Sequence, residues 1–231
     1  MFPVICRIGP FNFYSWGLMA AIGFLAGLAV ALRYARREGI KDENIYDLFI
    51  YVVISVIVGA RVVYVAVFPS EFLNNSLSIL YVNQGGLAFV GGLLAALIAI
   101  YVYARAHSIN MMKLLDALSP AAALGYAIGR IGCYLNGCCY GITLFGFVQP
   151  TQLYSSIAGL MILSILAYYY GKKKYDGHIF LLALFLYSIY RFFIEFIRYS
   201  PVHIGIFTPN QLAVLLIFIF SSYTLWKKSS T

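Results

Sequence analysis

Long apolar runs alternate with short polar segments along the whole chain. The runs fall near residues 13–32, 46–68, 86–104, 116–131, 151–170, 178–197 and 210–226. A helix of about 20 apolar residues crosses the hydrocarbon core of a bilayer. The pattern therefore predicts an all-α, polytopic integral membrane protein with about seven transmembrane helices. We expect one transmembrane helical domain over residues 1–231.

Composition narrows the class of protein further. Of the 231 residues, 62% are apolar and only 10% are charged. An ordinary soluble domain has about 25% charged residues, so this chain has too little polar surface to cover a water-exposed exterior. The same apolar content excludes a disordered chain.

The basic residues predict an orientation. Eleven of the 16 Lys and Arg fall in alternate loops and at the C-terminus: Arg33, Arg36, Arg37, Lys41, Arg105, Lys113, Lys172, Lys173, Lys174, Lys227 and Lys228. The opposite side has only Arg7 and Arg198. By the positive-inside rule, the N-terminus faces out and the C-terminus faces the cytoplasm, as seven crossings require. The rule explains the net charge of +8 without a nucleic-acid partner.

Glycine and proline interrupt two of the apolar runs. The fourth run is short and contains Pro120, Gly125 and Gly129, and the third contains Gly91 and Gly92. Broken backbone is tolerated in a membrane only where it is buried in protein or lines a cavity. We expect such segments to be broken or re-entrant.

Three arginines lie inside apolar runs or at their outer ends: Arg61, Arg130 and Arg191. Each is costly to hold in hydrocarbon unless it is paired or wetted. Arg61 fits either a phosphate ligand or a buried pair with Glu195 or Asp116. Asp116 lies near a cytoplasmic helix end, where it also fits a helix cap or a residue at the membrane interface.

The stretch from Gly129 to Gly141 is the most unusual in the chain, because glycines alternate with thiol and polar side chains. Glycine lets the backbone approach a ligand closely. The stretch fits either an anion site around Arg130 or a glycine-rich turn beside an arginine that snorkels to the interface.

Four cysteines map to the outer side: Cys6, Cys133, Cys138 and Cys139. They fit packing or one structural bridge, or else a reactive thiol or a metal-ligand set. The C-x4-C-C spacing has no histidine near it, and only His203 could join from outside. We therefore expect no metal site.

A second cluster follows helical spacing. Tyr187, Arg191, Glu195 and Arg198 are spaced i, i+4, i+8 and i+11, which places them on one helix face. An Arg191–Glu195 ion pair would lower the cost of burying both charges. The pair fits a purely structural role in holding helices together. Arg198, however, adds a surplus positive charge on the same face, which suits an anionic lipid headgroup.

The fifth apolar run begins with another polar group of residues. Gln152 and Tyr154 follow Pro150 and Thr151, which are ordinary residues for the start of a helix. The two side chains fit equally the lining of a polar cavity and a position at the membrane interface.

Together these motifs resemble the phosphatidylglycerol–prolipoprotein diacylglyceryl transferase family. The resemblance runs from about Trp16 to Gln211 and rests on WGLM at 16–19, GAR at 59–61, GGLAFVGGL at 85–93, GRIG, NG and G within 129–141, PTQLY at 150–154 and Arg191, Glu195 and Arg198. It implies seven membrane helices in the bacterial cytoplasmic membrane and an active site towards the outer leaflet. It also implies transfer of diacylglycerol from phosphatidylglycerol to the thiol of a lipobox cysteine in a preprolipoprotein. The products are a thioether and glycerol phosphate.

The resemblance implies roles for individual residues. Arg130 and Arg191 would bind the lipid phosphate and stabilise the leaving group, with Glu195 orienting Arg191 and Tyr187 lining the site. The substrate-binding residues would be Arg61, Asn136, Gly141, Gln152, Tyr154 and Arg198. The partners would be phosphatidylglycerol, membrane lipids and the preprolipoprotein, with no cofactor.

The chain also departs from the family pattern. Val90 stands where members usually have a histidine that helps to activate the thiol, and valine cannot accept a proton. Cys133 replaces an asparagine and Cys138 a glutamate. These departures leave two other hypotheses: a family paralogue with a different acceptor or with chemistry at Cys138 or Cys139, and a non-catalytic lipid carrier.

Overall fold

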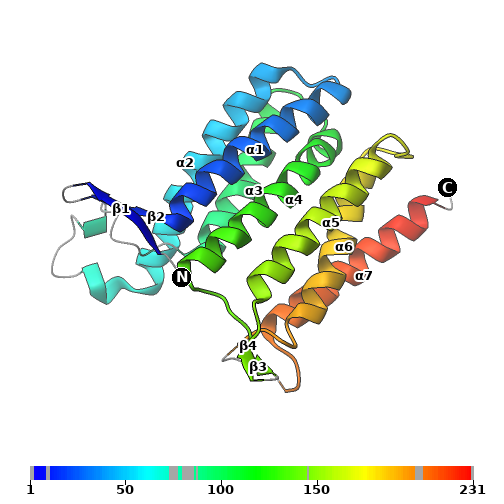
Figure 1. Cartoon of the computed structure of the whole chain (residues 1–231). Helices are drawn as coiled ribbons and strands as arrows, with labels where there is room; N and C mark the ends of the chain where they lie inside the picture. The colour runs from blue at the N-terminus through cyan, green and yellow to red at the C-terminus, as the bar shows by residue number, and fades with distance from the viewer. Residues whose placement is uncertain are drawn as a thin grey trace. The chain divides into compact units, whose positions relative to one another are not determined.

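A computed structural model describes residues 3–8, 11–72, 78–79, 86, 88–144, 146–200 and 205–229. These residues form seven α-helices (Figure 1): α1 Ser15–Arg37, α2 Asp42–Val67, α3 Phe89–Ala106, α4 Met111–Asn136, α5 Thr151–Tyr170, α6 His178–Ile194 and α7 Pro209–Ser229. Five of them, α1, α2, α3, α5 and α7, are long and apolar enough to cross a membrane. The prediction of an all-α, polytopic membrane protein is confirmed.

Helix α4 differs from its prediction. The fourth segment is one continuous helix of 26 residues with Pro120 inside it, so the expectation of a short, broken segment is wrong. Proline removes one backbone hydrogen bond from a helix. Membrane helices tolerate this because neighbouring groups satisfy the freed carbonyl, and Pro120 is fully buried.

The glycines of the third segment lie inside a helix and do not break it. A Cβ on Gly91 would lie 2.3 Å from the carbonyl oxygen of Gly59 and 2.6 Å from the Cβ of Val63. Small residues at such positions let two helices approach closely in a membrane. Gly91 therefore allows α3 to pack closely against α2.

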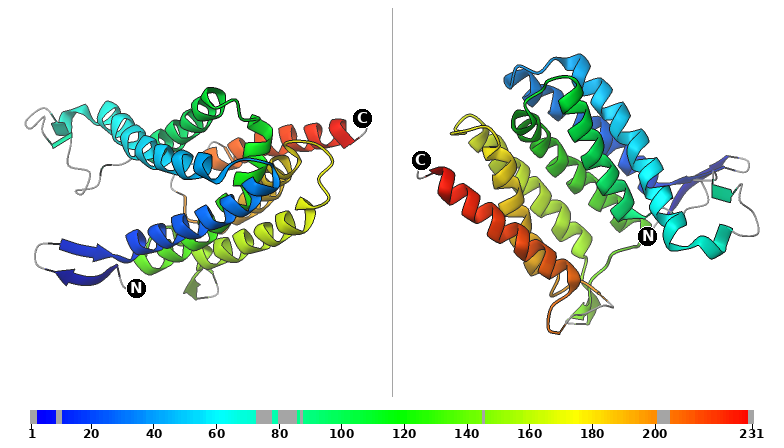
Figure 2. Two further views of the ribbon diagram at one scale, coloured as in Figure 1. Left: turned by 90° about the horizontal axis from the view of Figure 1, so that it is seen from above. Right: turned by 180° about the vertical axis from the view of Figure 1, so that it is seen from behind.

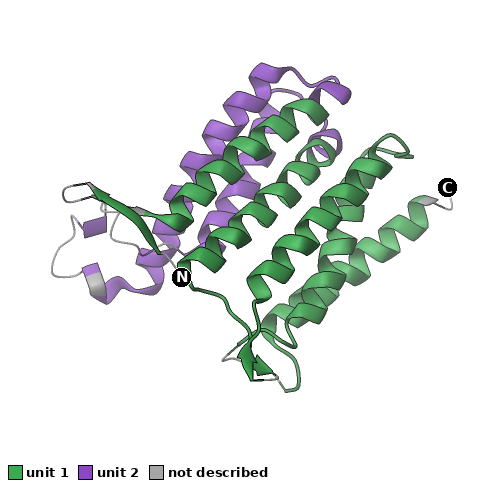
Figure 3. Cartoon of the chain, in the orientation of Figure 1, with its two compact units in different colours: residues 1–34, 115–231 green, residues 35–114 purple. Residues whose placement is uncertain are grey.

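The chain forms two compact units, which Figure 3 shows in different colours. Unit 1 contains residues 1–34 and 115–231, and unit 2 contains residues 35–114. In unit 1, α6 packs against both α5 and α7, and the backbone of α1 at Gly23 lies close to α4 at Gly125. In unit 2, α2 packs along α3. The single domain over residues 1–231 stays a prediction.

Two short hairpins and one 3-10 helix complete the described residues. Strand β1 (Val4–Ile8) pairs with β2 (Phe11–Tyr14), and β3 (Thr143–Leu144) pairs with β4 (Phe147–Val148), both antiparallel. The 3-10 helix, η1, spans Pro69–Phe72. The hairpin of β3 and β4 lies beside the start of α5 (Figures 1 and 2).

A buried carboxylate joins α4 to the start of α6. Asp116 is fully buried, and its two oxygens accept hydrogen bonds from the backbone N–H groups of Gly177 at 2.8 Å and Phe180 at 2.9 Å. Lys173 Nζ lies 3.5 Å from the same carboxylate. Orphan N–H groups at a helix start are commonly satisfied in this way. Of the two roles that the sequence allowed for Asp116, the structure supports the cap, because the residue is fully buried.

Replacing Asp116 by alanine is expected to lower stability. The change leaves two buried N–H groups without an acceptor, at a cost of about 1–3 kcal/mol each. Thermal unfolding of the purified protein in detergent measures the effect. Asp47→Ala is the matched control, because Asp47 is exposed on α2; equal unfolding temperatures for the two variants would contradict the capping role.

Replacing Gly91 by alanine is expected to destabilise the α2–α3 packing. The added methyl group would overlap the backbone of Gly59, and overpacking of this kind costs about 1–3 kcal/mol. The control is Gly17→Ala, since a Cβ on Gly17 meets no atom within 4 Å. The close-packing account fails if thermal unfolding does not separate the two variants.

Candidate functional site

The candidate residues, apart from Arg61, all lie in unit 1. They are Arg130, Cys133, Asn136, Cys138, Cys139, Gly141, Gln152, Tyr154, Tyr187, Arg191, Glu195 and Arg198. They lie near the ends of α4 and α6, near the start of α5, and on the segments that follow α4 and α6. In Figure 1 the start of α5 and the end of α6 lie near the β3–β4 hairpin, and a non-helical segment runs from the end of α4 to this hairpin.

A buried ion pair lies at the end of α6. Arg191 Nη1 lies 2.9 Å from Glu195 Oε2, and both side chains are buried. The other carboxylate oxygen, Oε1, accepts hydrogen bonds from Thr208 Oγ1 at 3.3 Å and Asn210 Nδ2 at 3.0 Å. The predicted pair is confirmed, and Glu195 also ties the end of α6 to the start of α7.

Arg130 carries a charge without a carboxylate partner among the described residues. Its guanidinium is half-buried and lies 4.9 Å from the ring centroid of Tyr126. The Tyr126 ring meets the Tyr187 ring edge-on, with centroids 5.6 Å apart. The charges of Arg130, Arg191 and Arg198 all act on the Tyr187 hydroxyl.

Among the described residues, the site therefore has three arginines and one carboxylate, which is committed to Arg191. A surplus of arginine in a partly buried place favours an anion, and the planar guanidinium fork suits a phosphate group.

Three thiols meet beside these cations. The Sγ atoms of Cys133, Cys138 and Cys139 all lie within 4.8 Å of one another. All three thiols are free, as is that of Cys6, which is exposed on β1. The sequence allowed a disulfide bond among these cysteines, and the described residues contain none. The three clustered sulfurs are candidate ligands for a metal ion.

Cys139 is the most polarised of the three thiols. Its pKa lies below the usual range of a thiol, because Cys133 donates a hydrogen bond to its sulfur and the charges of Arg198 and Arg130 act on it. Partial burial opposes this shift. A lowered pKa gives more thiolate, which is the nucleophilic and metal-binding form of cysteine.

The first turn of α5 holds the thiol segment in place. Thr151 Oγ1 donates to the carbonyl of Cys139 at 2.8 Å, and Gln152 Nε2 donates to the carbonyl of Cys138 at 2.6 Å. Gln152 is almost completely buried, and among the described residues its Oε1 has no hydrogen-bond partner. Gln152 therefore positions the thiols and keeps one acceptor atom unused.

Tyr154 and Gln149 brace the hairpin. The Tyr154 hydroxyl donates to Gln149 Oε1 at 3.1 Å, and Gln149 Nε2 donates to the carbonyl of Leu144 at 3.2 Å. The sequence allowed two positions for Gln152 and Tyr154, in a polar cavity or at the membrane interface. In the structure Gln152 is buried and Tyr154 is partly exposed.

Gly141 allows two distant segments to run side by side. It forms an antiparallel bridge with Arg198, and the N–H of Ile142 donates to the carbonyl of Ile197 at 2.9 Å. A Cβ on Gly141 would lie 2.5 Å from that same carbonyl oxygen. Gly141 thus lets the segment after α6 carry Arg198 to the thiols. Asn136 is the half-buried last residue of α4.

A cavity of about 290 Å³ opens beside the ion pair. Glu195, Arg198, Thr208 and Gln211 are among its polar lining residues, and Ile142 and Ile206 are among its apolar ones. The sequence reasoning did not single out Thr208, Asn210 or Gln211. Their signal is a Thr-Pro-Asn-Gln start to the last helix, which is typical of helix capping.

Arg61 lies in unit 2 and has a structural task there. It donates to the carbonyls of Ser78 at 2.6 Å, Ile79 at 2.9 Å and Gly86 at 2.9 Å, and its guanidinium lies 5.2 Å from the Phe72 ring centroid. These contacts join Arg61 to the described residues of the segment between α2 and α3. Its role toward the substrate stays a prediction, and His203 lies outside the described residues.

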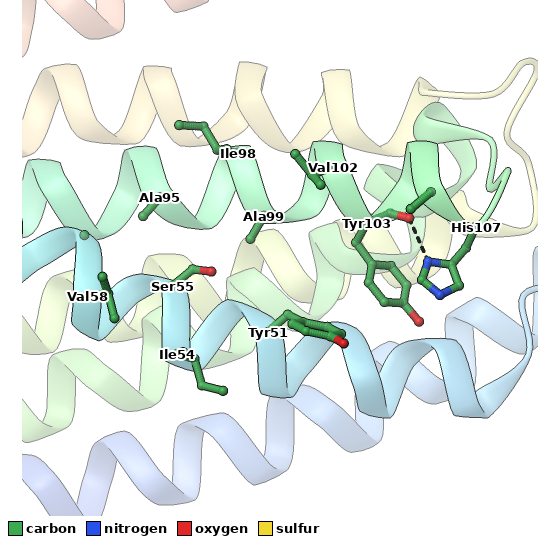
Figure 4. A pocket seen from close by; sticks show the side chains of 12 residues that line it. Tyr51, Ile54, Ser55, Val58, Ala95, Ile98, Ala99, Val102, Tyr103 and His107 are labelled. Carbon is green, nitrogen blue, oxygen red and sulfur yellow. Dashed lines mark hydrogen bonds between the residues drawn. The ribbon is translucent and has the colours of Figure 1, made fainter.

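A second, apolar groove of about 640 Å³ runs between α2 and α3 in unit 2 (Figure 4). Tyr51, Ser55, Val58, Ala99 and Val102 are among its lining residues. At one end, His107 Nδ1 lies 3.1 Å from the carbonyl of Tyr103. The groove holds none of the candidate site residues.

Comparison with known proteins identifies the family. Residues 3–227 match the family model described as prolipoprotein diacylglyceryl transferase. The phosphatidylglycerol–prolipoprotein diacylglyceryl transferase of Finegoldia magna is 36% identical over 215 residues, which cover 88% of this chain and 86% of the relative. The Clostridium kluyveri enzyme of the same name is 34% identical over 240 residues, covering 96% and 94%. The Rickettsia canadensis enzyme is 35% identical over 222 residues, covering 88% and 86%. The expectation drawn from the motifs is confirmed, and this chain belongs to the prolipoprotein diacylglyceryl transferase family.

Proposed function

We propose that this chain transfers the diacylglyceryl group of phosphatidylglycerol to the thiol of a lipobox cysteine in a preprolipoprotein. Family membership supports the reaction class. The observation that carries the proposal is Arg130, a half-buried cation without a carboxylate partner among the described residues, near the Arg191–Glu195 pair. This arrangement leaves positive charge free for the lipid phosphate.

The chemistry explains why cations are needed at this point. The acceptor thiolate attacks the carbon of the diacylglyceryl group that bears the phosphate ester. An S–C bond forms there, and the bond between that carbon and the phosphate oxygen breaks. Glycerol phosphate leaves with the electron pair, and the phosphate goes from one negative charge to two. Arginine forks bind the doubly charged group more strongly than the ground-state diester. Arg130 and Arg191 thus stabilise the transition state.

The supporting groups are already in place. Glu195 holds Arg191 through the ion pair, while Thr208 and Asn210 hold Glu195. Arg198 adds a third cation on the cavity that also contains Glu195. Arginine recognises phosphate through two parallel hydrogen bonds, and such geometry depends on fixed guanidinium planes. The pre-positioned ion pair therefore suits catalysis as well as binding.

The proposed orientation places this site at the outer leaflet of the bacterial cytoplasmic membrane. Helix α5 begins at Thr151, beside the thiol segment, and ends at Tyr170, separated by one residue from Lys172, Lys173 and Lys174. A helix of 20 residues is about 30 Å long. Lysine-rich loops favour the cytoplasm, so the site at the other end of α5 faces outward, with seven crossings, the N-terminus out and the C-terminus in.

Loss of either arginine is expected to abolish most of the transfer. The purified protein is mixed with labelled phosphatidylglycerol and a lipobox peptide, and mass spectrometry measures the diacylglyceryl-peptide formed. Arg130→Ala and Arg191→Ala are each expected to lower the rate by about 100-fold or more, because each removes charge stabilisation from the leaving phosphate. Arg130→Lys keeps the positive charge but lacks the planar guanidinium fork, so its transfer rate is expected to lie between those of the unchanged protein and Arg130→Ala.

The control is Arg105→Ala, since Arg105 lies in the last turn of α3 and outside the site. It is expected to keep the rate of the unchanged protein. Full transfer by both the Arg130→Ala and Arg191→Ala variants would show that the phosphate is not bound here. Bound phosphatidylglycerol without any transfer, even in the unchanged protein, would favour a paralogue with another acceptor.

A further inference from the structure

The transfer reaction needs a base for the acceptor thiol, and the described part of the site offers no free carboxylate or histidine for this task. Glu195 is committed to Arg191, Thr208 and Asn210. The position that the family pattern gives to a histidine is Val90. A thiol with an ordinary pKa of about 8.5 is mostly protonated at neutral pH, so some other group has to favour the thiolate.

The three thiols offer such a group if they bind a metal ion. Zinc prefers cysteine sulfur at about 2.3 Å, which places the sulfurs of a tetrahedral site about 3.8 Å apart. The Sγ atoms of Cys133, Cys138 and Cys139 already lie within 4.8 Å of one another, and all three are free. Closing the site therefore requires side-chain movements of about 1 Å.

The segment that carries these thiols is held in an unusual conformation. Gly137 has φ 76° and Cys139 has φ 63°, a left-handed value that costs a non-glycine residue about 1 kcal/mol or more. The two positive φ values turn the chain back after α4, so that Cys138 and Cys139 face Cys133. Thr151 and Gln152 fix the carbonyls of both residues. The cluster is thus held by the surrounding structure.

The charges around the cluster suit a zinc-thiolate group. Three thiolates and one Zn²⁺ leave a net charge of −1. The positive charges of Arg130 and Arg198 act on the cluster. No other His, Cys, Asp or Glu among the described residues joins the three sulfurs. Zinc sites with three protein ligands and an open fourth position are typical of catalysis, whereas structural sites have four.

We propose that Cys133, Cys138 and Cys139 bind Zn²⁺ and that the open fourth position takes the acceptor thiol of the lipobox cysteine. This inference rests on the proposed function. A thiol that coordinates zinc gives up its proton, which passes to water. Its sulfur then forms the S–C bond while the C–O bond breaks and glycerol phosphate leaves toward the arginines. Zinc keeps its charge throughout, and the neutral thioether product is a weak ligand that dissociates.

Cobalt(II) tests the site itself, because it replaces zinc and gives a sulfur-to-cobalt charge-transfer absorption. The full-length protein, purified in detergent under reducing conditions, is titrated with Co²⁺ alone. We expect one equivalent to bind per chain, with an intensity typical of three sulfur ligands, and Zn²⁺ to displace it. Cys133→Ser and Cys139→Ser are each expected to weaken binding by at least 10-fold.

The control variant is Cys6→Ser, since Cys6 is exposed on β1 and lies outside the cluster. It is expected to bind Co²⁺ as tightly as the unchanged protein. Thermal unfolding of each variant without metal separates lost ligation from lost folding. Absence of the absorption, or its survival in both serine variants of the cluster, overturns the proposal. So does a stable disulfide between two of the three thiols in the active protein.

Adding a lipobox peptide then tests the fourth position. The absorption of the Co²⁺-loaded protein is expected to change with the peptide and not with a peptide whose cysteine is replaced by serine. Transfer is expected to stop with a chelator and to return with Zn²⁺. Transfer that persists in metal-free protein overturns the zinc inference and leaves the proposed function intact. A peptide-dependent change without transfer under any condition supports the metal site and contradicts the proposed function.

Discussion

The buried Arg191–Glu195 ion pair is the interaction on which the rest of the site depends. A guanidinium held in an apolar helix is costly unless an opposite charge or water compensates it. Glu195 compensates Arg191 and, through its second oxygen, accepts hydrogen bonds from Thr208 and Asn210 at the start of α7. One carboxylate therefore fixes an arginine and joins two helices. Because it is fully used, the remaining arginines keep their charge for another anion.

The segments after α4 and α6 bring the rest of the site to this pair. Both segments leave helices whose sequences are far apart, and the bridge between Gly141 and Arg198 sets them side by side. A side chain on Gly141 would collide with the carbonyl of Ile197, so this contact depends on glycine. Thr151 and Gln152 at the start of α5 hold the thiol segment from the other side. The arginine and the thiols of the candidate site are thus positioned by backbone contacts as much as by side chains.

Some of this organisation follows directly from the sequence. Apolar runs of membrane length predict the helices, and the four-residue spacing of Arg191 and Glu195 predicts their pair. Both depend only on local periodicity. The same reasoning wrongly predicted breaks at Pro120 and Gly91. A local pattern does not show whether neighbouring groups satisfy the carbonyl that proline leaves free. Nor does it show that a glycine is there to let a second helix pack closely. The residues around Glu195 on α7 also depend on long-range packing, which spacing does not reveal.

The thiol cluster shows the same limit in a more informative way. The C-x4-C-C spacing differs from that of common zinc sites, and on spacing alone a metal was not expected. Spacing rules assume ordinary backbone between ligands, whereas here left-handed φ values at Gly137 and Cys139 bring three sulfurs together. By the resemblance drawn from the motifs, Cys133 and Cys138 stand where family members have asparagine and glutamate, and in the structure the two residues belong to one cluster. Two positions that look independent along the sequence therefore lie in one group of sulfurs in space, and under the zinc proposal a change at either one would alter the same ligand set.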